Sequence, residues 1–151
     1  MDFHLRDFRP EDLEILWKID QQCFVAGISY SRLELETYIE RRGSFTLVAE
    51  ATPDSAILGF IVSESSKRGA GHIITIDVLP EARRFGVGSK MLDAAEARLR
   101  AAHCFAVFLE TAVDNKPALA FYKRHEYFLV KTHPRYYGNG LDAFVLKKEL
   151  K

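Results

Sequence analysis

Two arginines and two glycines stand close together in the segment Arg83–Ser89, which reads RRFGVGS. Glycine has no Cβ, so the backbone at Gly86 and Gly88 can come close to a ligand. A helix is expected to begin here, and the first N–H groups of a helix are free and lie at its positive dipole end. Together with the two guanidinium groups, these amides could hold a phosphate or pyrophosphate.

Neither of the common phosphate-binding signatures is complete in this loop. The Walker string Gly-x-x-x-x-Gly-Lys-Ser/Thr is missing, and no third glycine completes Gly-x-Gly-x-x-Gly. Taken alone, the segment fits a phosphate-binding loop and a basic turn that only caps a helix about equally well. The flanking elements must decide between these two interpretations.

The elements around the loop place it beside a predicted parallel strand pair. Ile73–Leu79 is rich in β-branched residues and stops at Pro80, which cannot donate a ladder hydrogen bond. The helix after the loop is apolar on one side, and Phe105–Thr111 is a second apolar strand. A strand–helix–strand passage of this length predicts a parallel pair with a right-handed crossover. A ligand can enter where such strands diverge.

The remaining elements predict a mixed sheet of six to seven strands with helices on both faces. Further strands are expected at Phe3–Phe8, Phe45–Ala51, Ile57–Ser63, Tyr127–Thr132 and Leu141–Lys147. Further helices are expected at about 10–23, after a capping box at Ser31–Glu34, and at about 114–124. The order β-α-α-β-β-β-α-β-α-β-β predicts an α/β (α+β) fold, and residues 1–151 are expected to form a single domain.

The composition argues against several classes of partner. The chain has 151 residues, of which 48% are hydrophobic, enough for one core. Lys and Arg number 21, and so do Asp and Glu, which disfavours a nucleic-acid or membrane-surface binder. The histidines and the two cysteines show no metal-ligand spacing, so no metal is expected. Without an apolar signal segment or a membrane-length apolar run, we expect a cytoplasmic protein with reduced thiols.

Three blocks of the sequence resemble the GNAT superfamily of N-acetyltransferases. Arg83–Gly88 matches the pattern Gln/Arg-x-x-Gly-x-Gly/Ala of its acetyl-CoA loop, and Asn115–Tyr122 (NKPALAFY) resembles its N-x-x-A-x-x-L/F-Y helix. The segment 135–143 (RYYGNGLDA), with Cys23–Phe24, resembles the RimI-like protein N-terminal acetyltransferases. The resemblance covers essentially the whole chain and implies the GNAT fold, with one splayed parallel strand pair.

This resemblance implies acetyl-CoA as the co-substrate. The backbone of Ile76–Val78 would pair with the pantetheine arm, and the Val78 N–H would hold the acetyl carbonyl. Backbone amides of the glycine loop would hold the pyrophosphate. The residues expected to bind acetyl-CoA are therefore Ile76, Asp77, Val78, Arg83, Arg84, Phe85, Gly86, Val87, Gly88, Ser89, Asn115 and Tyr122.

Acetyl transfer from a thioester to an amine needs a base for the amine and a proton for the leaving thiolate. Glu110, at the end of the second parallel strand, is the candidate base, and Tyr122 is the candidate acid. By pattern alone, Glu110 is more typical of a solvated strand end and Tyr122 of a core tyrosine; the resemblance favours the catalytic roles. His72 is an alternative base because histidine titrates near neutral pH.

The resemblance implies the α-amino group of a protein or peptide N-terminus as the acceptor. An α-amine has a pKa of about 7.7–8.0, against about 10.4 for lysine, so it loses its proton more readily near neutral pH. The candidate contacts to the peptide are Phe24, Tyr30, Tyr136 and Tyr137. Two alternatives stay open, a small-molecule amine acceptor and a non-catalytic acyl-CoA sensor. A monomer or a homodimer is expected.

The chain departs from the family pattern at His125–Tyr127, where the family commonly has Leu-Gly-Phe. Glycine often ends a helix in the left-handed conformation, and Glu126 would adopt that conformation only with strain. Val25 also stands where related enzymes often have a proline, so the substrate loop is expected to differ in shape.

Overall fold

A seven-stranded sheet runs through the molecule in the computed structural model, which describes residues 1–150. The strands are β1 (Phe3–Asp7), β2 (Ser44–Ala51), β3 (Ile57–Ser65), β4 (Ala70–Val78), β5 (Ala106–Ala112), β6 (Phe128–His133) and β7 (Ala143–Glu149). The helices are α1 (Leu13–Cys23), α2 (Arg32–Glu40), α3 (Val87–Ala101) and α4 (Lys116–Arg124), with short 3-10 turns η1 (Pro10–Asp12) and η2 (Pro80–Ala82). The strand order is β1-β2-β3-β4-β5-β7-β6.

The predicted order of helices and strands is confirmed, with small shifts at the boundaries. The predicted first helix is divided, because the chain makes the turn η1 before α1 begins. β4 starts at Ala70, earlier than expected, because Ala70 and Gly71 continue the ladder although neither is a typical strand residue. The capping box is present: the Ser31 hydroxyl accepts from the Glu34 N–H, and Glu34 accepts from the Ser31 N–H.

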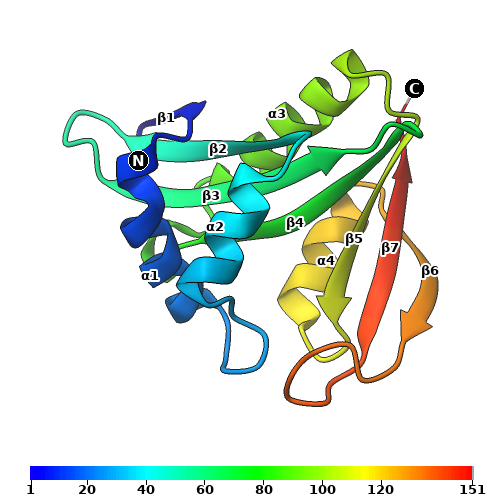
Figure 1. Cartoon of the computed structure of the whole chain (residues 1–151). Coiled ribbons are helices and arrows are strands. Elements are labelled where there is room, and N and C mark those ends of the chain that lie inside the picture. The colour runs from blue at the N-terminus through cyan, green and yellow to red at the C-terminus, as the bar shows by residue number, and fades with distance from the viewer. Residues whose placement is uncertain (151) are drawn as a thin grey trace.

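The helices cover the sheet on both faces, with α1 and α2 on one side and α3 and α4 on the other (Figure 1). On the first face, Leu16 and Leu35 pack with Phe60 in one buried cluster. On the second face, Met91 and Leu99 of α3 belong to a larger buried cluster that includes residues of β5 and β7. The apolar side predicted for the helix after the glycine loop therefore lies on the sheet.

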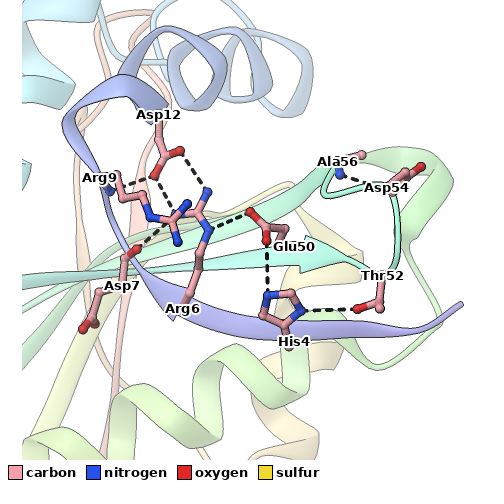
Figure 2. A network of polar contacts seen from close by, with 9 residues as sticks. All are labelled: His4, Arg6, Asp7, Arg9, Asp12, Glu50, Thr52, Asp54 and Ala56. Atoms are coloured by element: carbon pink, nitrogen blue, oxygen red, sulfur yellow. Dashed lines mark hydrogen bonds and ion pairs between the residues drawn. The ribbon is translucent and has the colours of Figure 1, made fainter.

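A polar network fixes the N-terminal strand to the first turn and to β2 (Figure 2). The Arg6 guanidinium donates to both carboxylate oxygens of Asp12 at 2.8 and 2.9 Å, and its Nε donates to Glu50 at 2.7 Å. Asp12 also accepts from the Arg9 N–H at 2.8 Å. The Asp12 carboxyl is buried, but its hydrogen bonds from Arg6 and Arg9 outweigh the burial and lower its pKa.

The predicted parallel pair is β4 with β5, and it is short. Ala70–His72 pairs with Ala106–Phe108, and no further residues of the two strands pair. Directly after this stretch, the register between β3 and β4 shifts, leaving Ile74 as an extra residue in β4. A bulge of this kind bends a strand. The two halves of the sheet diverge from that point, and the gap between β4 and β5 widens in Figure 1.

Candidate active site

A cavity of about 930 Å³ lies in the opening between β4 and β5. Its lining comes from both diverging strands, the glycine loop, α4, and the loops before α2 and after β6. The residues predicted to bind donor or acceptor that line it are Phe24, Tyr30, Ile76, Val78, Arg83, Arg84, Gly86, Val87, Gly88, Ser89, Glu110, Asn115, Tyr122, Tyr136 and Tyr137.

The glycine loop reaches α3 through two left-handed residues. Arg84 has φ +70° and Gly86 has φ +82°, and a Cβ built on Gly86 would have no heavy atom within 4 Å. The first hydrogen bond of the helix runs from the Lys90 N–H to the Gly86 carbonyl. The N–H groups just before Lys90 therefore have no partner inside the helix and lie at the cavity. The loop thus has the geometry of an anion site.

The edge of β4 presents its backbone to the opening. The Leu79 N–H donates to the Leu58 carbonyl at 2.9 Å, so it points toward β3. Because successive N–H groups of a strand point to alternate edges, the Val78 N–H points to the other edge, toward β5. The strands no longer pair at this level, so this N–H is in place to bind a ligand carbonyl.

Tyr122, on α4, is one of the residues that line the cavity. The Asn115 side chain caps this helix by accepting from the Ala118 N–H at 3.2 Å. The Tyr122 side chain is buried and packs edge-on against Phe121 and Tyr127. Burial, with a smaller contribution from nearby negative charge, raises the pKa of Tyr122 far above its usual value. The phenol therefore keeps its proton at any working pH.

Glu110 and His72 meet across the parallel pair. The His72 Nε2 and Glu110 Oε1 atoms are 2.7 Å apart, and the Tyr136 hydroxyl lies 3.5 Å from the same oxygen. On its other side, the His72 Nδ1 atom lies 3.7 Å from Glu64. Burial favours neutral imidazole, but the hydrogen bond to Glu110 and the two carboxylate charges outweigh it and raise the pKa of His72 above 6.5.

A second cavity, of about 990 Å³, adjoins the first one at Glu110, which lines both. It is lined by Glu64, His72, Lys131 and neighbouring residues of β3 to β7. Glu110 therefore borders both cavities.

Two loops meet over the mouth of the first cavity. The loop between α1 and α2 contains Phe24 and Tyr30, and the loop between β6 and β7 contains Tyr136 and Tyr137. They are joined by a hydrogen bond from the Gly138 N–H to the Gly27 carbonyl at 2.9 Å. The four aromatic residues predicted to contact the acceptor thus lie on adjoining walls.

The structure does not bring the side chains of Asp77 and Phe85 to the cavity. The Phe85 side chain is exposed on the surface, and the Asp77 side chain is buried. Asp77 could therefore contact the co-substrate only through its backbone. In residues 1–150, no group of three His, Cys, Asp or Glu side chains is arranged to hold a metal ion, and no helix is long and apolar enough to cross a membrane.

The model of the acetyltransferase (GNAT) family matches residues 13–127. The chain belongs to this family. An N-alpha-acetyltransferase of Saccharolobus solfataricus is 26% identical, over 99% of this chain and 94% of that protein. The structure of Ard1 from Thermoplasma volcanium matches with a TM-score of 0.91 and 25% identity, over 100% of this chain and 99% of the other.

The expected GNAT membership and fold are thereby confirmed. The ribosomal-protein-S18-alanine N-acetyltransferase of Escherichia coli matches with a TM-score of 0.86 and 16% identity, over 99% of this chain and 95% of the other. At that identity the likeness shows the fold alone. The departure at the end of the GNAT α4 helix is also present: Glu126 has φ +71°, the left-handed conformation expected for that position.

Several residues that line the first cavity were not among the contacts predicted from the sequence. Cys23, Ile28, Ile74, Arg124 and Leu141 all line the first cavity. Cys23 and Ile28 flank predicted contacts in the sequence, so proximity alone could have suggested them. Leu141 lies inside the 135–143 block that resembles the RimI-like enzymes, so that block could have suggested it. Arg124 carries no such signal, because only the packing of α4 brings it to the cavity.

Proposed function

We propose that this GNAT acetyltransferase transfers the acetyl group of acetyl-CoA to the α-amino group of a peptide or protein N-terminus, by direct attack in a ternary complex. The observation that carries this proposal is the position of Glu110, which lies where the two cavities meet and is hydrogen-bonded to His72. A donor lying along β4 and an acceptor held between the aromatic walls of the same cavity would both lie beside this carboxylate.

Acetyl-CoA would occupy the cavity between the strands. Its pyrophosphate would accept from the free N–H groups at the start of α3, with Arg83 and Arg84 supplying positive charge. The pantetheine arm would lie along β4 as an added strand, and Asn115 and Tyr122 would line its far side. The Val78 N–H would donate to the thioester oxygen as negative charge develops on it.

Glu110 and His72 would act together as the base. The amine nitrogen attacks the thioester carbon, forming the C–N bond, and the amine gives up one proton. The Glu110 carboxylate is held at 2.7 Å from the imidazole, so a proton taken at this pair is shared by both groups. An α-amine with a pKa of about 7.7–8.0 needs no stronger base near neutral pH.

Tyr122 would complete the reaction by protonating the leaving group. As the C–S bond breaks, the electron pair stays on sulfur, and the phenol can donate its proton to that thiolate. The neutral, buried state of Tyr122 keeps this proton available. The phenolate that results would regain a proton from solvent once the product leaves.

The choice of a peptide N-terminus as acceptor is supported by the relative in Saccharolobus solfataricus, whose name states that activity. It is also supported by the walls of the cavity mouth, where Tyr30, Tyr136 and Tyr137 offer aromatic faces and hydroxyls to an extended peptide. A small amine would leave these aromatic surfaces without a contact.

The catalytic roles can be tested by two conservative variants. Glu110→Gln and Tyr122→Phe should each lower kcat roughly 100-fold, because each removes one proton-transfer group. Glu64→Gln is the matched control: it also contacts His72 but does not line the first cavity, and its kcat should fall much less. Transfer at the wild-type rate by Tyr122→Phe would remove the tyrosine from this mechanism.

The acceptor can be tested with a panel of amines. Short peptides with a free N-terminus should be acetylated, whereas polyamines, amino sugars and N-terminally blocked peptides containing lysine should not. Equal use of the blocked peptides would contradict the choice of the α-amine. Tight binding of acetyl-CoA with no turnover of any amine would favour an acyl-CoA sensor.

A further inference from the structure

Two acidic side chains are buried against each other where α1 crosses β4. Asp20 is 0% exposed and Asp77 is 1% exposed, and the Asp20 carboxyl group lies near enough to raise the pKa of Asp77. Neither lines the cavities described above. Burying a carboxylate without a partner is costly, and two in contact also repel each other. The mechanism proposed above gives this pair no role.

Each carboxyl group has one oxygen that accepts a hydrogen bond and one that does not. The Tyr30 N–H donates to Asp20 Oδ2 at 2.7 Å, and the Thr75 hydroxyl donates to Asp77 Oδ1 at 2.5 Å. In residues 1–150, the other two oxygens, Asp20 Oδ1 and Asp77 Oδ2, are buried without a donor. A single proton between the two groups would satisfy both orphaned oxygens as an O–H···O⁻ bond.

The surroundings favour keeping that proton on Asp77. Burial, and next the Asp20 carboxylate, raise the pKa of Asp77 well above its ordinary value. The Thr75 hydroxyl and the Arg83 guanidinium oppose this shift but do not cancel it. The other titratable groups facing the pair are the Cys23 thiol on α1, the Tyr30 phenol before α2 and the Tyr122 phenol on α4, all neutral at working pH because burial raises their pKa values.

We propose that Asp20 and Asp77 share one proton and serve as positioning residues for the acceptor loop. Protonated Asp77 donates to Asp20, and the Asp20 carboxylate holds the backbone N–H of Tyr30. Tyr30 is anchored further by Gln21, which donates to its carbonyl at 2.7 Å. The loop that ends at Tyr30 is thereby tied to β4, the strand that would carry the thioester.

Loss of the shared proton should disturb the acceptor side of the cavity more than the acetyl-CoA side. Two buried negative charges at the contact between α1 and β4 would push the helix and the start of α2 away from the strand. The loop with Phe24, Ile28 and Tyr30 lines the acceptor side of the cavity, so it would loosen first. The KM for the acceptor should then rise more than the KM for acetyl-CoA; this consequence, unlike the shared proton itself, rests on the proposed function.

Infrared spectroscopy tests the shared proton without any activity measurement. At neutral pH the wild-type protein should show the C=O stretching band of a protonated carboxyl group, and Asp77→Asn should lack it. Asp12→Asn is the matched control, because Asp12 is also buried but is paired with Arg6 and ionised (Figure 2). The control should keep the band. Absence of the band from the wild type, or its persistence in Asp77→Asn, would overturn the proposal.

Unfolding measured against pH gives a second test that is independent of the acceptor. The proton on Asp77 stabilises the fold fully below its unfolded pKa of about 3.8, and this contribution is lost as pH rises toward the raised folded pKa. Asp77→Asn has a permanently neutral side chain whose N–H can donate to Asp20. The Tm of the wild type relative to this variant should therefore fall as pH rises; a constant difference would contradict the shared proton.

Kinetics test the positioning role. Asp77→Ala should raise the acceptor KM roughly tenfold, about the effect of losing one or two net hydrogen bonds, with a smaller change in kcat. Asp77→Asn should regain most of the loss, and its acceptor KM should not rise at alkaline pH as the wild-type value does. If the acceptor KM of Asp77→Asn is as high as that of Asp77→Ala, the hydrogen bond between the two side chains has no positioning role. If no peptide is a substrate, the infrared and unfolding results still stand, so failure of the proposed function remains distinguishable.

Discussion

At the scale of single residues, the imidazole of His72 decides the pH at which the proposed base can act. It lies between Glu110, at 2.7 Å, and Glu64, at 3.7 Å, and these carboxylates raise its pKa above 6.5 in spite of burial. A protonated imidazole cannot accept another proton. The pair of Glu110 and His72 therefore becomes a full base only as pH rises through this raised pKa.

We predict that kcat for peptide acetylation rises with pH through the raised pKa of His72. In Glu110→Gln, the strongest group that raises this pKa is gone, so the acidic limb should move to lower pH while the maximum rate falls. A pH–rate profile of kcat for both proteins measures the two effects. A limb that stays in place in Glu110→Gln would mean that another group sets it.

The contact between Glu110 and His72 could not be derived from the sequence. Side chains alternate along a strand, so Glu110 shares a face with Phe108, and both line the second cavity. The partner, however, depends on the register of the parallel pair, in which His72 lies opposite Phe108. No local pattern in the sequence encodes that register, because the two strands are joined through a whole helix. Both candidate bases were predicted from the sequence, but the hydrogen bond between their side chains was not.

At the scale of elements, the network around Arg6 holds β1 to the start of the first helix (Figure 2). Arg6→Met should lower the free energy of unfolding by about 2 kcal/mol, because it leaves the buried Asp12 carboxylate without its main partner. Urea denaturation measures this loss. Arg32→Met is the control, since its pair with Glu14 is half exposed and should be worth less than about 1 kcal/mol.

The same network should depend on pH in the opposite sense to Asp77. The pKa of Asp12 lies below 3.8 in the fold, so its stabilising effect is complete above that pH and is lost as pH falls further. The difference between the wild type and Arg6→Met should therefore shrink in acid. A difference that stays constant down to strong acid would show that Arg6 acts through packing rather than through this charge.

Gly86 allows a test of whether the left-handed backbone conformation of the glycine loop, just before α3, matters for binding of acetyl-CoA. Gly86→Ala places a side chain at φ +82° in open space, so the cost is backbone strain of about 1 kcal/mol rather than a clash. We expect a lower Tm and a roughly fivefold weaker affinity for acetyl-CoA, because the loop would relax away from this conformation. Calorimetry measures both.

Gly140→Ala is the matched control for this loop. Gly140 has φ +87° with no heavy atom near its Cβ position, and it lies in the loop between β6 and β7. It should lower the Tm by a similar amount and leave the affinity for acetyl-CoA unchanged. Equal loss of affinity in both variants would show that general destabilisation, and not the loop, controls binding.

Local signals predicted the elements better than their edges. The capping box at Ser31, the proline at Pro80 and the apolar side of α3 are read within one or two turns of chain, and each was correct. The early start of β4 was missed because Gly71 lowers strand propensity. Its position is set instead by tertiary packing: a Cβ there would lie 2.8 Å from Leu99 on α3.

At the scale of the whole molecule, the parallel pair was predictable and the strand order was not. A helix between two strands leaves no room for a hairpin, and this fixed the direction of β5 relative to β4. The last strand, β7, instead inserts between β5 and β6. This pairing joins residues far apart in sequence, so only the folded core selects it. The resemblance implied the correct topology because it carried that non-local information.

The short seam between β4 and β5 has a consequence for cooperativity. Within residues 1–150, the ladder between the two halves of the sheet has only three residue pairs, at Ala70–His72 and Ala106–Phe108. One further backbone hydrogen bond, from the Phe105 N–H to the Gly69 carbonyl, lies next to them. A ligand that lies along β4 would add backbone hydrogen bonds beyond the seam. Such a ligand stabilises only states in which both walls of the opening are formed, by about 2.7 kcal/mol at 100 times its dissociation constant.

Amide hydrogen exchange should reveal this seam directly. Without ligand, we expect residues 73–78 and 109–112, which pair along one edge, to exchange faster than β2 and β3, which are paired along both edges. Saturating acetyl-CoA should slow exchange on both sides of the opening, including the β5 side. Slowing confined to the glycine loop would mean that the halves open independently. Slowing on both sides would mean that bound acetyl-CoA acts as part of the sheet. The two halves of the sheet would then unfold together only while acetyl-CoA is bound.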